Sequence, residues 1–334
     1  MVKEVMKLYS CSVCVLLFFT PHESLSSLQI DFSLLIIRYI IYKAPRQAGY
    51  RLTGLEYIYI DSTMKTMETY TSGKLINDSD GVLANTLRPL LKQSHTHLLL
   101  QKEDNYLYNC SCSPGVVMVE KHKTGVWLSH STPRFPFRRD QNNFWPQSGT
   151  KNAQTFICVT FPHDQFMAIG KNLCMRVFIA LPKERYEPHR TCVSSVSTEC
   201  VFSVSTDLCC CSADGDLYTT IANTYSSNVE VQSWPCEQDA SFCPTNLHNV
   251  INVKSITIRG LGQWGAGIDH SKWCVTTDNN KPLICIADVN RRMSQYKRRG
   301  GALCFESEHV RTMFKGFITD TEPCSSSRRL LHSV

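Results

Sequence analysis

Apolar residues recur along the chain with two spacings, which predict strands and helices in alternation. Short β-branched or aromatic runs predict strands over residues 34–41, 57–60, 116–119, 126–128, 156–161 and 229–234. Apolar residues at helical spacing follow Asp164 and Asp214, and an aspartate is a favourable N-cap. With 334 residues, 43% of them hydrophobic, the chain is long enough for two packed units.

A set of polar residues interrupts the apolar pattern in the C-terminal part. His270 and Lys272 are two residues apart on a segment predicted to be extended, so their side chains point to the same side. A returning strand brings Asp288, Asn290 and Arg291 alongside. An imidazole beside a fixed ammonium group, joined by a carboxylate, an amide and a guanidinium, can attack and hold phosphate. The pattern therefore predicts phosphate chemistry.

These residues resemble the deoxyribonuclease II family of acid endonucleases, within the phospholipase D superfamily. The family motif Asp-His-Ser-Lys-Trp-Cys stands at residues 269–274, and the family's Asp-Met-Asn-Arg reads Asp-Val-Asn-Arg at 288–291. Further segments match the family in the same order, at 42–45, 57–61, 130–136, 154–159, 215–218 and 299–304. Several separate matches in one order argue against chance.

The resemblance implies an α+β fold of the phospholipase D type. Two similar halves, each a mixed sheet flanked by helices, would enclose the active groove between them. We expect the N-terminal half over residues 28–190 and the C-terminal half over 214–324. The Ser-, Thr- and Cys-rich stretch 191–213 is the expected connection, and the tail 325–334 is expected to be disordered.

The resemblance also implies a reaction, namely hydrolysis of double-stranded DNA at acid pH through a phosphohistidine intermediate, leaving 3'-phosphate ends. No metal and no cofactor is expected. His270 would be the reactive imidazole, Lys272 would stabilise charge on the phosphorane, and Asn290 would position the phosphate. Asp288 and Arg291 are expected to bind substrate. An isolated His-x-Lys would more often be structural, so this assignment depends on the surrounding family matches.

An internal repeat locates the corresponding residues of the first half. His270 precedes Asp288 by 18 residues, and the residue 18 positions before His130 is Cys112. The family's first-half motif His-Thr-Lys-Gly reads here Cys-Ser-Pro-Gly, with Pro114 in the place of the lysine. A thiol is almost wholly protonated at acid pH, so Cys112 is a poor replacement for the histidine. We therefore expect impaired activity from an eroded first-half site.

Two other first-half residues are candidates for the site. His130 can contribute to proton transfer, although a histidine at a strand end is commonly structural. Arg134 can contact a DNA phosphate, although a basic run is usually a solvated face. The net charge of +6 favours a polyanionic partner but does not identify one.

The cysteine content and the N-terminus indicate secretory traffic. The chain has 17 cysteines, which favours an oxidising compartment. Lys3 and Lys7 precede an apolar run over residues 11–19, which predicts a signal peptide over 1–27, with a buried strand as the alternative. No segment is long enough to span a membrane. We expect a lysosomal or secreted protein.

Two glycosylation sequons begin at Asn77 and Asn109 and fit this traffic. The resemblance implies two disulfides, Cys285 with Cys304 and Cys243 with Cys324. The family pairs the cysteine matching Cys158 with one near the mature N-terminus, and this chain has none between residues 14 and 110.

Three readings stay open from the sequence. The chain is an impaired nuclease, a catalytically dead paralogue that binds DNA in the same groove, or the product of a misplaced exon boundary that removed residues around 112–115. The oligomeric state is also open.

Overall fold

The computed structural model describes most of the two expected halves. The described residues are 35–63, 65–70, 73–91, 97–101, 115–120, 123–138, 140–165, 177–179, 216–296 and 301–324. The predicted signal peptide 1–27, connection 191–213 and tail 325–334 lie outside them, so these boundaries stay predictions. No helix in the described part is long and apolar enough to cross a membrane.

The N-terminal half is built on one sheet, of eight strands among the described residues, in the order β3-β2-β1-β7-β6-β5-β4-β8. Every neighbouring pair is antiparallel. Its strands are β1 (Ile36–Lys43), β2 (Tyr57–Asp61), β3 (Met67–Thr69), β4 (His97–Gln101), β5 (Gly115–Glu120), β6 (Thr124–His130), β7 (Gln154–Pro162) and β8 (Val177–Ile179). Short helices join them: η2 (Ala48–Tyr50), α1 (Val82–Thr86), α2 (Arg88–Leu91), α3 (Ser148–Lys151) and η4 (His163–Gln165).

The C-terminal half is built on a second sheet, of seven strands among the described residues, in the order β11-β10-β9-β12-β13-β14, with β15 paired to β10. Only β9 and β10 run parallel in this described sheet. Its strands are β9 (Val229–Gln232), β10 (Val250–Ile258), β11 (Gly262–Gly265), β12 (Trp273–Thr276), β13 (Leu283–Ala287), β14 (Ala302–Glu306) and β15 (Ile318–Thr321). Its helices are α5 (Leu217–Thr224), η7 (Ala266–Ile268), α6 (Met293–Tyr296) and α7 (Glu308–Phe317).

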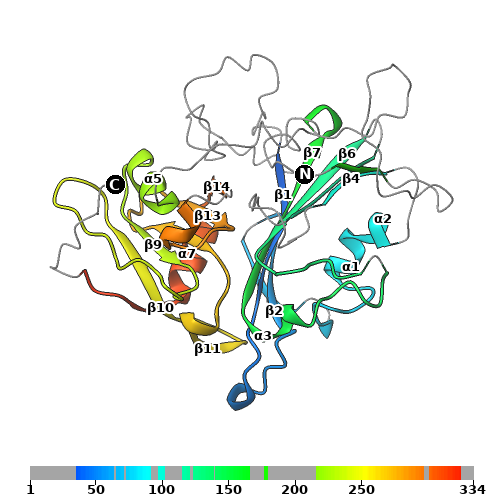
Figure 1. Cartoon of the computed structure of the whole chain (residues 1–334), viewed down its shortest axis with the longest axis horizontal. Coiled ribbons are helices and arrows are strands. Elements are labelled where there is room, and N and C mark those ends of the chain that lie inside the picture. The colour runs from blue at the N-terminus through cyan, green and yellow to red at the C-terminus, as the bar shows by residue number, and fades with distance from the viewer. Residues whose placement is uncertain are drawn as a thin grey trace.

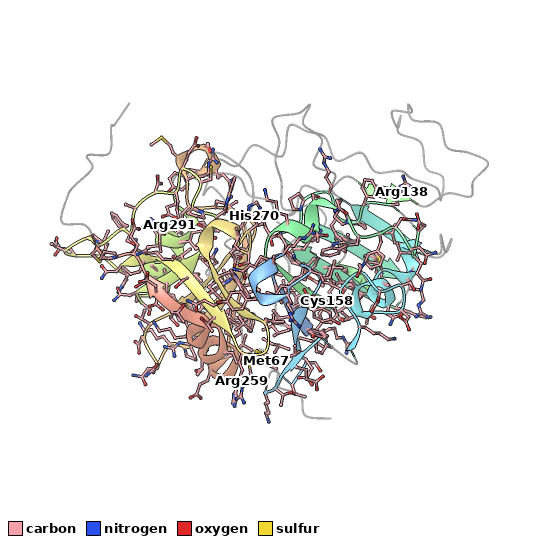
Figure 2. The ribbon with its side chains drawn as sticks, turned by 90° about the horizontal axis from the view of Figure 1, so that it is seen from below. Met67, Arg138, Cys158, Arg259, His270 and Arg291 are labelled. Carbon is pink, nitrogen blue, oxygen red and sulfur yellow. A yellow bond between two sulfur atoms is a disulfide. The ribbon has the colours of Figure 1, made fainter. Side chains whose placement is uncertain are left out.

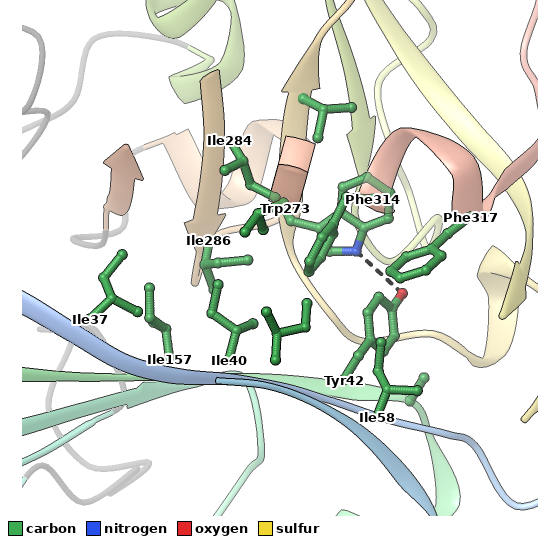
Figure 3. Close-up of a cluster of buried hydrophobic side chains, with 14 of the residues drawn as sticks. Ile37, Ile40, Tyr42, Ile58, Ile157, Trp273, Ile284, Ile286, Phe314 and Phe317 are labelled. Carbon is green, nitrogen blue, oxygen red and sulfur yellow. Dashed lines mark hydrogen bonds between the residues drawn. The ribbon is translucent and has the colours of Figure 1, made fainter. Parts of the chain in front are cut away.

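The two halves lie side by side and share one apolar core (Figure 1). Seen from below, His270 lies where they meet (Figure 2). Apolar side chains of β1 and β7 face those of β12, β13 and α7 across this core, and Tyr42 points from β1 toward Trp273 (Figure 3). Each sheet is buried on its other face as well, under α1 and α2 in the first half and α5 in the second. Because the halves bury apolar surface against one another, neither is expected to keep its shape alone.

The structure confirms the predicted α+β fold and most of the predicted strands. The first sheet is antiparallel rather than mixed among the described strands, and five of its seven neighbouring pairs are consecutive in the chain. The helix predicted after residue 214 is α5, and its N-cap is Asp216, whose side chain accepts from the Tyr218 N–H. The helix predicted after Asp164 lies mostly outside the described residues, which contain only the turn η4.

A similar hairpin forms the middle of both sheets. In the first half β5 and β6 pair between β4 and β7, and in the second β12 and β13 pair between β9 and β14. All three pairings in each set are antiparallel. The internal repeat expected from the sequence stays a prediction.

Both predicted disulfides are present. Cys243 is bonded to Cys324, and Cys285 on β13 is bonded to Cys304, directly opposite it on β14. The Cys158 thiol is free and buried on β7, and burial raises its pKa to about 12. It is therefore an inert part of the core.

Candidate active site

The segment that carries His270 docks on the N-terminal half through its backbone. The Ala153 N–H donates to the Ile268 carbonyl and the His270 N–H donates to the Ala153 carbonyl, both at 2.9 Å. Residues 270–272 precede β12, which begins at Trp273, so the motif lies in the connection before the strand rather than on it. One half thus supplies the histidine and the other supplies the surface that holds it.

Asp269 anchors this segment in the interior. Its carboxylate is fully buried and accepts hydrogen bonds from the Tyr42 hydroxyl at 2.6 Å, the Trp264 Nε1 at 2.7 Å and the Ser271 N–H at 2.8 Å. The Tyr42 hydroxyl is also within 2.8 Å of the Ser271 Oγ and accepts from the Trp273 Nε1 at 3.2 Å. A buried carboxylate needs such donors, so this network fixes the backbone on the N-terminal side of His270.

The His270 imidazole is half-buried against an aromatic ring and among cations. Its centroid lies 4.6 Å from that of Trp234, which follows β9. Its pKa is lowered to about 4, first by burial and then by the positive charges of Lys272, Lys151 and Lys43. The imidazole is therefore neutral at moderately acid pH and stands in a positive field, as an attacking group for an anionic phosphate requires.

Lys272 folds back over the same segment. Its side chain is 7% exposed, and its Nζ donates to the His270 carbonyl at 2.8 Å. The Lys272 carbonyl accepts from the Ala287 N–H, which ties the segment to β13. The ammonium group therefore lies against the His270 backbone.

Asn290 and Asp288 lie in the chain that leaves β13. The Asn290 Oδ1 accepts from the Trp234 N–H at 3.1 Å, which connects it to the ring covering His270. Asp288 is buried and accepts from the Gly301 N–H at 2.7 Å. Asn290 thus lies next to the histidine's aromatic neighbour, whereas Asp288 holds the loop before β14.

Arg291 lies inside the C-terminal half (Figure 2). Its side chain is 2% exposed, its Nε pairs with Asp216 at 2.7 Å, and one terminal nitrogen donates to the Asn252 Oδ1 at 2.6 Å. Further bonds go to the carbonyls of Asp239 and Ala240. To bind substrate, as the sequence predicts, this guanidinium would first have to leave these partners.

The first-half candidates are placed differently. His130 is 2% exposed and its ring contacts Phe135 and Phe156, on the sheet face turned away from the shared core. Arg134 is exposed, as is Asn77 of the first sequon. The eroded positions Cys112 and Pro114, and Asn109 of the second sequon, lie outside the described residues, although β5 begins at the next described residue, Gly115.

Three residues near His270 were not predicted from the sequence. The sequence predicts only a strand for Trp234 and only a match to a family segment for Lys43, and it gives no role to Lys151. Lys151 is exposed on α3, whereas Lys43 is fully buried at the end of β1. Within the described ranges, no group of three or more His, Cys, Asp or Glu side chains could hold a metal ion.

Comparison with known proteins identifies one family. The model of the family described as Deoxyribonuclease II matches residues 37–324. Similar proteins include the mouse (Mus musculus) deoxyribonuclease-2-alpha, 28% identical over 324 residues, which cover 86% of this chain and 90% of that protein. Plancitoxin-1 of Acanthaster planci is 28% identical over 326 residues, covering 86% and 89%. Human (Homo sapiens) deoxyribonuclease-2-beta is 26% identical over 325 residues, covering 86% and 88%.

Proposed function

The chain belongs to the deoxyribonuclease II family, and from this premise we propose that it hydrolyses DNA at acid pH with His270 as the attacking group. Membership makes it an endodeoxyribonuclease by family. The names of its relatives point to DNA as the substrate. The observation that carries the proposal is a half-buried imidazole that docks at the junction of the halves beside Lys272, with its pKa lowered by burial and nearby lysines.

The proposed reaction proceeds in two steps. A ring nitrogen of His270 attacks phosphorus, the bond to the 5'-oxygen breaks, and that oxygen takes up a proton as it leaves. Water then cleaves the phosphorus–nitrogen bond, which regenerates the imidazole and leaves a 3'-phosphate. Lys272 lies beside the imidazole and would stabilise the charge on the phosphorane, and Asn290 would position the phosphate. Asp288 and Arg291 are also proposed to bind substrate, which requires each side chain to leave its present hydrogen-bond partners.

The family's proton donor belongs to the first half, where Cys112 and Pro114 replace histidine and lysine. We therefore propose that cleavage is slow. This substitution also favours a second candidate, a protein that binds DNA in the groove without cutting it. Whichever holds, we propose a lysosomal or secreted location and a mechanism without metal, with DNA contacts that include Arg134.

The test is plasmid nicking at acid pH in the presence of a chelator. His270→Ala should abolish nicking, because removing the nucleophile of such a site costs on the order of 10⁴-fold or more in rate. His309→Ala is the matched control, since this histidine is exposed on α7. Nicking that needs magnesium or survives His270→Ala would refute the assignment. DNA binding without any nicking would favour the second candidate.

A further inference from the structure

Lys43 is a buried cation with three carbonyl partners. Its side chain is 0% exposed at the end of β1. Its Nζ donates to the carbonyls of Ala44 at 2.8 Å, Gly54 at 2.9 Å and Thr150 at 3.4 Å. An ammonium group has three protons to donate, and these bonds use all of them. Lys43 therefore joins three segments and has no proton left for a substrate.

One of the segments that Lys43 joins is residues 150–153, here called the platform. The Arg46 N–H, three residues after β1 ends, donates to the Lys151 carbonyl, so Lys43 and Arg46 hold the platform at two successive carbonyls. At Gly54, whose φ is +85°, a Cβ would lie only 2.0 Å from the Thr150 carbonyl oxygen. The two chains can approach this closely because Gly54 has no side chain, and Lys43 bonds the carbonyls of both.

The platform ends at the residue on which the histidine docks. Ala153 makes the two backbone hydrogen bonds to Ile268 and His270, across the junction of the halves. A shift of the platform would therefore move the His270 backbone.

Tyr42, the residue before Lys43, contacts the residues on either side of His270. Successive side chains of a strand point to opposite faces. Tyr42 accordingly enters the shared core (Figure 3). There its hydroxyl donates to Asp269 and lies 2.8 Å from the Ser271 Oγ. Tyr42 thus contacts the residues before and after His270, whereas Lys43 bonds the platform whose last residue holds the His270 backbone.

We propose that Tyr42 and Lys43 are positioning residues for His270, acting across the junction through Asp269 and the platform. This role rests on the proposed function, because it matters for catalysis only if His270 reacts. The charged groups around the imidazole are Lys272 from its own segment and Lys43 and Lys151 from the first half. The aromatic Trp234 covers the ring on the side of β9.

Tyr42→Phe is the first test, with Tyr39→Phe as its matched control. Both tyrosines are buried on β1, but the Tyr39 hydroxyl bonds Thr86 within the first half. Both variants should lose similar stability. Only Tyr42→Phe should shift the His270 imidazole signals in an NMR pH titration and lower kcat about 10- to 100-fold with little change in KM. Unchanged His270 signals in Tyr42→Phe would overturn the proposal, whether or not the protein cuts DNA.

Lys43→Met is the second test, with Lys254→Met as its control. Lys254 is an exposed lysine paired with Asp320. Loss of the buried cation should move the His270 pKa from about 4 toward 6.5, and loss of the exposed one should not. Equal His270 titrations in the two variants would contradict the role of Lys43. If Lys43→Met does not fold, Tyr42→Phe decides the proposal alone. If the parent protein does not nick DNA but Tyr42→Phe still shifts the His270 signals, the nuclease function is refuted and the positioning stands.

Discussion

The two central hairpins differ in chemistry although they share one layout. In the second half the approach to β12 carries His270 and Lys272, and the exit from β13 carries Asn290 near Trp234. In the first half the residues before β5 are Cys112 and Pro114. The exit from β6 carries His130, whose ring is packed among phenylalanines on the far face of the sheet. The two hairpins thus share strand pairing, whereas the correspondence of Cys112 and Pro114 with His270 and Lys272 stays a prediction from the sequence.

Whatever its own side chains do, the first half contacts the segment that carries His270. It supplies the platform under His270, the Tyr42 hydroxyl for Asp269 and two of the cations around the imidazole. Such contacts depend on the junction, so the first half remains necessary even if its own motif has been lost. Three changes test these differences between the halves: restoring the first-half motif, removing the buried Arg291 side chain and lowering the pH.

Restoring the first-half motif should give the largest effect. The double substitution Cys112→His and Pro114→Lys should raise the rate of DNA cleavage by about 10²- to 10⁴-fold, because it returns a general acid and a paired cation. DNA affinity should change little. Plasmid nicking rates and DNA binding of the parent and the double variant give the measurement.

The control adds His270→Ala to the double variant, which should remove the gain. Equal rates in the parent and the double variant would mean that residues 112–114 are not the eroded site. Fast cleavage by the parent would mean that another group donates the proton, and His130→Gln would then be tested first.

Arg291 is expected to stabilise the second half rather than the groove. Arg291→Ala should cost about 3–5 kcal/mol of unfolding free energy, because it leaves buried partners without their cation. Its neighbour Arg292 pairs with the exposed Glu237, so Arg292→Ala should cost no more than about 1 kcal/mol. Chemical denaturation of both variants would measure these two losses of unfolding free energy. A stable Arg291→Ala protein with weakened DNA binding would instead support the substrate role predicted from the sequence.

Much of this architecture could be predicted from the sequence, because periodic apolar runs report local structure. The run 283–287 is strand β13 as predicted, and the two disulfides follow the family pattern. The pairing of His270 with Lys272 could also be predicted, since both belong to one motif.

The contacts across the junction could not be predicted. Tyr42 lies 227 residues before Asp269, and no local pattern reports that separation. The burial of Arg291 could not be predicted for the same reason, because its partner Asp216 is 75 residues away in the chain. Side-chain direction beyond a strand end depends on such distant partners, which is why His130 and Arg291 point away from where the motif alone would place them.

The pH dependence of stability should give the smallest effect and is specific to the second half. The folded protein holds the His270 pKa at about 4, below the ordinary 6.5, so the unfolded chain binds this proton more tightly. Stability from this group is therefore complete above about pH 6.5 and is lost as pH falls toward 4. Because the imidazole is only half-buried, we expect a loss on the order of 1 kcal/mol.

Thermal unfolding between pH 7 and 4.5 would measure this loss. His270→Gln should lose less stability on acidification than the parent, whereas His309→Gln, changed at an exposed position on α7, should follow the parent. Parallel pH curves for the parent and His270→Gln would mean that the imidazole is not held neutral in the folded protein. Since attack on phosphorus requires the neutral ring, that result would remove the lowered pKa as support for His270 as the nucleophile.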